Sequence, residues 1–414
     1  MVQLMLNGFG GDRRQSGGKP PASNPYDVEC YHVNARVSKE LEDIGDFRLS
    51  KLFLLFAYCV QAIWCRYRYG VRTLYYIPAP GKHSALYRDW LVMFLCRPFY
   101  RRVILHWHAA GLAKWLETSI QFRARAFTYH RMKDVDLSVV LSQYNRADAE
   151  KLFPKQIRIV SNGIPDPCPK FEIEILPRRQ ARCAARKKLA AAHALTNADL
   201  ESTGGDPQRF KVLYLAHCTR EKGLFDTING LLAANAKLTE SKSPFVLELM
   251  IAGNFVNAEE RAEFDRICKT PEGQSSIRYL GFVASAAKEQ ALREADLFCF
   301  PTYYPNENQP VNLIEAMAFG LPILTTHWRS LPELLPPGYE CLVDICSPEQ
   351  IANALIAGLT MDTAASFREI FLRQFTLEQY LTELAQAFHN AESANRDSRA
   401  PALTLQTDRP ASSR

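Results

Sequence analysis

Two glutamates separated by seven residues, Glu307 and Glu315, are the side chains of this sequence best suited to chemistry. The first follows an apolar run typical of a buried strand, and the second lies just inside a predicted helix that ends at a Gly-Leu-Pro turn. A carboxylate can accept paired hydrogen bonds from neighbouring hydroxyls, which is how proteins hold sugar rings. The spacing therefore predicts two hydroxyl clamps, with the backbone N–H groups of the helix start between them available to a phosphate.

The residues between the two glutamates are rich in side-chain amides. Amides both donate and accept hydrogen bonds, so they suit the selection of sugar hydroxyls. An ordinary capped helix with a surface glutamate is the alternative interpretation, but it leaves the order of the whole stretch unexplained. The further predicted members of this site are Asn308, Gln309, Pro310, Val311 and Asn312.

A second polar loop, "HCTREKG" at residues 217–223, lies between a predicted strand and a predicted helix. The start of a helix carries unpaired N–H groups and a partial positive charge. Arg220 and Lys222 add two cations to that start, which suits a diphosphate, and His217 and Gly223 are secondary candidates. Many strand–helix loops contain a lysine, so this loop alone is a weak signal.

Two histidines end a predicted strand in "RVILHWHAAG". Side chains two residues apart on a strand point the same way, so His106 and His108 share a face if the chain is extended. A histidine at the carboxyl end of a parallel strand can reach a ligand, although a structural role is as common. We find no further ligands that would complete a metal site, and no metal is expected.

A chain of 414 residues is too long for one ordinary core, so two domains must position these loops. Strands and helices alternate in both halves, which predicts an α/β protein with two parallel-sheet domains. We expect an N-terminal domain over residues 1–165, a linker over 166–208 and a C-terminal domain over 209–365. Ligands of such folds bind at the carboxyl ends of the strands, here in a cleft between the domains. A final long helix is expected over 366–390, and residues 392–414 are expected to be disordered.

Several elements are predicted individually. "MVQLML" reads as a short strand before a Gly-rich loop, residues 26–35 as a strand, and residues 51–70 as a helix ending at Gly70. An Asn-Gly turn is expected within residues 161–167, and one long helix over 367–391.

Charge and cysteine content bound the class of protein. Residues 1–165 contain 24 Lys+Arg against 13 Asp+Glu, so this half either faces an anionic partner or is a solvated basic face. The apolar run at residues 52–65 is shorter than the roughly 20 residues of a membrane span, and predicts a buried helix or one that touches a membrane surface. Eleven scattered cysteines without C-x-x-C pairs indicate a reducing compartment, and no nucleic-acid-binding motif is present.

Taken together, these motifs resemble glycosyltransferase family 4, whose members have the GT-B fold of two Rossmann-like domains facing a cleft. Glu307 and Glu315, followed by "AMAFGLPILTT", match its E-x7-E signature, and Lys222 matches its phosphate-loop lysine. His108 best matches its N-terminal-domain histidine, with His106 as the fallback. "SNGIPDP" resembles its domain junction and "FTLEQYLTELAQAF" its closing helix, so the resemblance covers about residues 70–390.

The resemblance implies a retaining, metal-independent transferase without a cofactor. A nucleotide-sugar would be the donor, and a glycan or lipid-linked glycan of cell-surface polysaccharide synthesis the acceptor. Glu315 would bind the ribose, Glu307 the transferred sugar and the positive charge at its anomeric carbon, and Lys222 with Arg220 the departing diphosphate. His108 would contact the donor sugar. The protein would be cytoplasmic, with peripheral contact at the inner face of the membrane through its basic half.

Three features depart from the family pattern. Ala216 and His217 replace the usual Gly-Arg before the lysine loop, residues 308–310 replace a usual glycine, and the first strand has only a degenerate Gly-rich loop or is missing, leaving the N-terminal domain incomplete. A degenerate nucleotide-sugar-binding protein and a GT-B sugar-nucleotide epimerase therefore stay open as alternatives. A dehydrogenase is excluded, because no G-x-G-x-x-G lies between a strand and a helix with an acid about twenty residues on.

Overall fold

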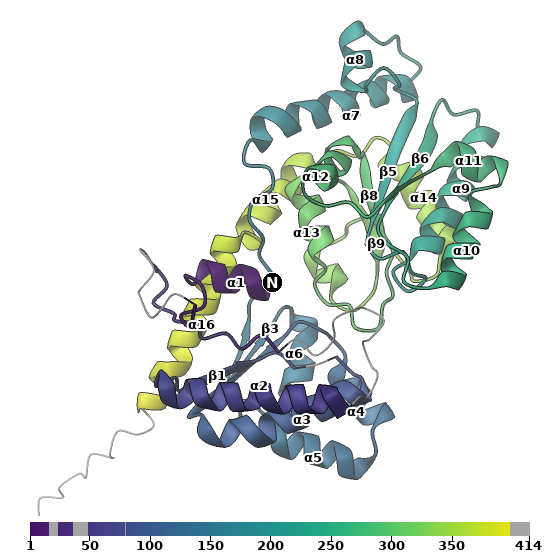
Figure 1. Ribbon diagram of the computed structural model, residues 1–414. Helices are drawn as coiled ribbons and strands as arrows, with labels where there is room; N and C mark the ends of the chain where they lie inside the picture. The colour runs from purple at the N-terminus through teal and green to yellow at the C-terminus, as the bar shows by residue number, and fades with distance from the viewer. Residues whose placement is uncertain (16–23, 36–48, 79, 398–414) are drawn as a thin grey trace, which may run out of the picture.

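The computed structural model describes residues 1–15, 24–35, 49–78 and 80–397, and it contains two parallel sheets. Figure 1 shows them in separate lobes, with the last helix, α16 (Leu377–Asp397), running from the C-terminal lobe down the side of the N-terminal one. The predicted α/β class and the GT-B arrangement of two Rossmann-like domains are confirmed. The domain boundaries given above stay a prediction.

The N-terminal sheet has four parallel strands in the order of the chain. Its strands are β1 (Thr73–Tyr76), β2 (Arg102–Trp107), β3 (Leu137–Val140) and β4 (Ile157–Ile159). In β2, Val103, Leu105 and Trp107 pack with one helical layer, while Ile104 packs with α1 (Val2–Gly8) and α16 on the other face. The first layer consists of α2 (Leu49–Arg68), α3 (His83–Cys96), α4 (Leu112–Ser119), α5 (Phe122–Met132) and α6 (Gln143–Glu150).

The C-terminal sheet is doubly wound, with the strand order β10-β9-β8-β5-β6-β7. The order reverses between β5 and β8, and the crevice at such a reversal is where open α/β sheets bind ligands. The strands are β5 (Arg209–Leu215), β6 (Val246–Ala252), β7 (Ile277–Gly281), β8 (Leu297–Phe300), β9 (Ile323–Thr326) and β10 (Leu342–Val343). The helices between them are α9 (Leu224–Glu240), α10 (Ala258–Ile267), α11 (Pro271–Ser276), α12 (Ser285–Glu294), α13 (Val311–Ala318) and α14 (Pro348–Gly358).

Two predictions at the start of the chain are wrong. "MVQLML" is not a strand but part of helix α1, because Met5, Leu6 and Phe9 are spaced to bury one helical face against α16. Residues 26–35 form no strand either, and only an isolated bridge pairs Cys30 with Asp12. Within the described residues, the first strand is therefore β1, and the predicted Gly-rich loop partly lies outside them.

The two chain crossings between the domains also differ from expectation. Residues 161–163 are extended rather than a turn, and Ile164 exchanges backbone hydrogen bonds with Phe375 and Leu377 (2.9 and 2.8 Å). This pairing breaks the predicted single long helix into α15 (Ala364–Gln374) and α16. Gly163 is needed because a Cβ there would lie 2.3 Å from the carbonyl oxygen of Thr376. The two crossings thus run side by side, joined by backbone hydrogen bonds.

The end of the chain corrects the predicted disordered tail in part. Helix α16 continues to Asp397, so residues 392–397 are helical, and the rest of that prediction, residues 398–414, lies outside the described residues. The eleven cysteines are all free thiols.

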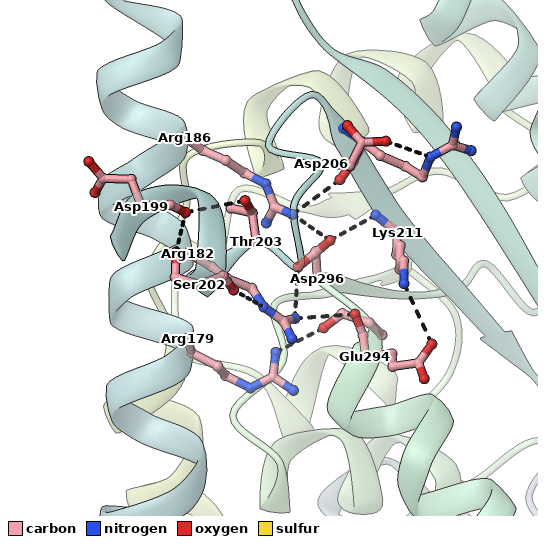
Figure 2. Close-up of polar contacts among 12 residues, drawn as sticks. Arg179, Arg182, Arg186, Asp199, Ser202, Thr203, Asp206, Lys211, Glu294 and Asp296 are labelled. Carbon is pink, nitrogen blue, oxygen red and sulfur yellow. Dashed lines mark hydrogen bonds and ion pairs between the residues drawn. The ribbon is translucent and has the colours of Figure 1, made fainter. Parts of the chain in front are cut away.

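The expected linker contains two helices, the basic α7 (Leu176–Ala190) and the short α8 (Asn197–Ser202). Figure 2 shows arginines of α7 pointing at Asp296, at the start of β8. Arg186 and Arg182 donate to the two oxygens of that buried carboxylate (2.7 and 3.2 Å), and the backbone N–H of Lys211 donates as well (2.8 Å). These contacts fasten α7 to the C-terminal sheet.

Candidate active site

The predicted lysine loop lies at the crevice, between β5 and α9. Gly223 caps α9 with a φ of 82°, and a Cβ at this position would lie 2.3 Å from the carbonyl oxygen of Pro301. Only glycine fits so close an approach, which brings the loop against the segment that follows β8. Lys222 Nζ thereby reaches Glu307 Oε2 at 2.6 Å and lies 4.4 Å from the ring centre of Tyr304.

Glu307 is held so that one carboxylate oxygen stays available. Its residue exposure is 7%, and its Oε2 accepts hydrogen bonds from Lys222 and from the Thr302 hydroxyl at 3.2 Å. Its Oε1 has no hydrogen-bond partner among the described residues. This oxygen is not enclosed by protein, so it stays accessible. The structure therefore brings two predicted site residues together across 85 positions of sequence and leaves an acceptor atom facing the crevice.

Glu315, in α13, is arranged in the same way. Its Oε1 accepts from Lys288 Nζ of α12 at 2.5 Å, and its other oxygen has no partner in the described parts of the chain. Pro310 is the N-cap of α13 and no side-chain hydrogen bond caps this helix start. Sequence reasoning missed Lys288, because nothing in the local pattern of α12 marks it.

The predicted sugar-selecting amides have other partners here. Asn308 hydrogen-bonds Asn145 of the N-terminal domain, and the hydroxyl of Ser142 donates to it at 3.4 Å. Gln309 Oε1 accepts from the backbone N–H of Asn162 at 2.5 Å. Both amides are buried and join the two domains.

Two further contacts hold the segments around the crevice in place. Asn312 Nδ2 donates to the carbonyl oxygen of Leu215 at the end of β5 (2.8 Å), which ties α13 to the lysine loop. Glu333 accepts from the backbone N–H groups of Gln143 and Tyr144 (2.8 and 2.7 Å), at the positive start of α6. Sequence reasoning also missed Glu333, whose partners lie 190 positions away.

The two histidines lie on one face of the chain, as predicted, with ring centres 4.3 Å apart. His106 is fully buried, and its Nδ1 is 2.5 Å from the hydroxyl of Tyr75. His108 is half-buried at the end of β2, and burial lowers its pKa to about 4. The Nε2 of His108 is enclosed without a partner among the described residues, and at neutral pH the ring is an uncharged hydrogen-bonding group.

Two predicted residues lie at the edge of this arrangement. The guanidinium of Arg220 pairs with Glu263 of α10 at 2.6 Å and stacks on Phe225, and its side chain is exposed. His217 is exposed too, and its carbonyl accepts from the hydroxyl of Tyr214. Among the described residues, no group of three His, Cys, Asp or Glu side chains is placed to hold a metal ion.

Comparison with known proteins agrees with this geometry. Residues 197–389, slightly less than half of the chain, match the family model described as "Glycosyl transferases group 1". The match agrees with the predicted enzyme class and covers the C-terminal domain with Lys222, Glu307 and Glu315. A phosphatidyl-myo-inositol mannosyltransferase of Mycobacterium leprae is 36% identical over 87 residues, which are 21% of this chain and 23% of that relative. The chain thus matches less than a quarter of that relative's length.

Solved structures resemble the whole fold. HepE of Anabaena in complex with UDP aligns with a TM-score of 0.57 at 15% identity, covering 81% of this chain and 82% of that one. Sucrose-phosphate synthase of Thermosynechococcus elongatus aligns with a TM-score of 0.57 at 18% identity, covering 84% and 81%. At these identities the likeness shows the shared two-domain fold.

Proposed function

We propose that this chain, with its group 1 glycosyltransferase domain, is a retaining family 4 glycosyltransferase that uses a nucleotide-sugar donor. The observation that carries the proposal is the Lys222–Glu307 pair at the point where the strand order reverses, with Glu315 eight positions further on. The solved structure of HepE with UDP-glucose is a GT-B neighbour whose ligand belongs to the proposed donor class. The acceptor is a glycan or lipid-linked glycan of cell-surface polysaccharide synthesis.

In this mechanism the bond between the anomeric carbon and the diphosphate oxygen breaks and a bond to the acceptor oxygen forms on the same face. The proton of the acceptor hydroxyl passes to the departing diphosphate oxygen. Lys222 neutralises the diphosphate, and the open oxygen of Glu307 stabilises the positive charge on the sugar ring. Glu315 accepts from the ribose hydroxyls, while neutral His108 hydrogen-bonds the sugar from the other domain. We expect no metal ion to take part, as the family resemblance implies.

Donor binding gives the direct test. In a thermal-shift screen with UDP-, GDP- and ADP-sugars, one nucleotide class should raise the melting temperature, because a ligand that binds only the folded state stabilises it. Glu315→Gln should weaken that binding about tenfold, since the amide replaces one hydroxyl acceptor with a donor. Glu272→Gln, an exposed position on α11, is the matched control and should bind normally. A protein that no nucleotide-sugar stabilises would contradict the proposal.

We further propose that the N-terminal domain rests on the inner face of the membrane. Helix α2 contains no acidic residue and exposes a stripe of Phe53, Phe56, Val60, Trp64 and Tyr67, whose spacing of three and four residues places them on one helical face. Helix α3 lies beside α2, and α5 lies beside α3 (Figure 1); both expose further aromatic side chains.

The charges of this layer fit an anionic lipid surface. Residues 49–133 contain 14 Lys+Arg against two Asp+Glu, and one of those acids, Asp89, is buried. Arg125 and Arg131 lie over exposed aromatic rings of α5, Phe122 and Phe127. No helix in the described ranges is long and apolar enough to cross a membrane. A basic, aromatic face of this kind suits binding in the plane of the interface.

Vesicle co-sedimentation tests this contact. Binding to phosphatidylcholine vesicles should rise steeply when anionic phosphatidylglycerol is included, and Phe53→Ser with Trp64→Ser should reduce it about tenfold or more. Phe282→Ser removes an equally exposed aromatic side chain (71%, against 75% for Phe53) from the C-terminal domain and should have no effect. Binding that ignores anionic lipid content would count against the membrane contact.

A further inference from the structure

An arginine on the loop between β9 and η3 (Leu331–Leu334) has no assigned task in the site described above. Arg329 is half-buried and its Cζ lies 5.3 Å from the ring centre of Trp328, but no hydrogen bond or ion pair links its guanidinium to any described residue. Its Nε is enclosed without a partner. A guanidinium stays charged at all physiological pH values, and a partly desolvated charge without a counter-ion costs folding free energy.

The backbone around Arg329 is held in place on both sides. Trp328 Nε1 donates to the carbonyl oxygen of Tyr304 at 2.9 Å, and the hydroxyl of Ser330 donates to Asn308 Oδ1 at 3.1 Å. Arg329 itself has a φ of 51°, a left-handed conformation that a residue with a side chain adopts at a cost. Two anchored neighbours and a strained backbone fix where this side chain starts.

The guanidinium reaches across to the N-terminal domain. A Cβ at Gly111 would lie 2.4 Å from Nη1 of Arg329, so the arginine fills the space that a larger residue at position 111 would need. Gly111 follows His108 by three positions and begins α4. Arg329 therefore lies where the two domains meet, beside the loop that follows His108, whereas Lys222 lies beside Glu307 in the C-terminal domain.

We propose that Arg329 binds a phosphate group carried by the acceptor. This inference rests on the proposed glycosyltransferase function, in which Lys222 already serves the diphosphate of the donor. A planar guanidinium suits bidentate hydrogen bonds to a phosphate, and such charge-assisted bonds are among the strongest in proteins. The same chemistry is present in the donor diphosphate, so the experiment must separate the two sources.

Isothermal titration of the full-length chain with inorganic phosphate, at saturating UDP, makes that separation. UDP is replaced by GDP or ADP if the donor screen selects one of them. The wild type should still bind phosphate when the nucleotide is bound, Arg329→Ala should weaken that binding about tenfold or more, and Arg329→Lys should weaken it less. Arg178→Ala removes an exposed arginine of α7 and should change nothing.

Three results would overturn the proposal. In the first, phosphate does not bind the wild type. In the second, phosphate binds Arg329→Ala as tightly as the wild type, which would mean that the arginine only packs between the domains. Alternatively, Arg329→Ala could weaken nucleotide binding as much as phosphate binding, which would assign the guanidinium to the donor. The melting temperature of each variant shows that it is folded, and failure of every variant to bind any nucleotide would instead contradict the proposed function.

Discussion

Glu307→Gln should lower kcat by roughly 100- to 1,000-fold while changing donor affinity less than tenfold. The amide keeps the shape of the side chain but removes the negative charge that faces the anomeric carbon through Oε1. The carboxylate compensates a positive charge that exists mainly in the transition state, so its loss affects turnover more than binding. Lys222 loses its ion-pair partner at 2.6 Å but keeps its position over Tyr304, so it still meets the diphosphate.

Steady-state kinetics with the donor found in the thermal-shift screen, together with a direct binding measurement, check this expectation. The assay is run in EDTA, because the proposed charges are compensated without a metal ion. Glu272→Gln removes one negative charge from the exposed surface of α11 and should behave as the wild type. Unchanged turnover of Glu307→Gln would remove the central residue of the mechanism. A loss of activity explained entirely by weaker binding would instead make Glu307 a donor-binding residue.

The C-terminal half of the site could be predicted from the sequence because its residues lie in or next to regular strands and helices. Lys222 and Glu307 each follow a buried strand, β5 or β8, and parallel strands bring their carboxyl ends to the same edge of a sheet. The apolar runs of these strands and the turn residues after them are local signals. Their contact across 85 positions therefore followed from fold class alone.

The residues that join the domains could not be predicted in this way. Asn308, Gln309 and Glu333 find their partners about 150 to 190 positions away, and nothing local separates an amide that meets a sugar from one that meets the other domain. The strand prediction for the start of the chain was wrong for a different reason. "MVQLML" is apolar at nearly every position, so its pattern fits a strand and a helix equally, and packing on α16 decides for the helix.

Asp296→Asn should destabilise the C-terminal domain by about 3–5 kcal/mol. The carboxylate is buried and faces three donors, the guanidinium groups of Arg182 and Arg186 and the backbone N–H of Lys211 (Figure 2). An asparagine of the same size presents one acceptor and one donor, so an N–H group faces a guanidinium. The buried cation Arg186 and the partly buried Arg182 then lose their counter-charge. The side chain of Arg186 is 6% exposed, so water cannot replace the lost partner.

Thermal unfolding followed by circular dichroism measures the effect, and the midpoint should fall by roughly 6–20 °C. Asp206→Asn is the matched control, because this exposed carboxylate pairs with the similarly exposed Arg209 at 3.0 Å. Exposed pairs of this kind contribute about 0–1 kcal/mol, so the control should hardly move the midpoint. Equal midpoints for the two variants would show that the network around Asp296 does not hold α7 to the sheet.

The pH dependence of the unfolding free energy of the same variant supplies an independent test. Burial raises the pKa of Asp296, but the arginines and the Lys211 N–H outweigh it, so that the pKa in the folded protein lies below the ordinary 3.8. A depressed carboxyl pKa contributes stability that is fully present above the pKa of the unfolded chain and is lost as the pH falls through the folded value. The gap in unfolding free energy between wild type and Asp296→Asn should therefore be constant from about pH 5 to 7 and shrink below about pH 4, because only the wild type takes up this proton. A gap that stays constant down to pH 3 would mean that the cost of the substitution comes from packing rather than from the charge of the carboxylate.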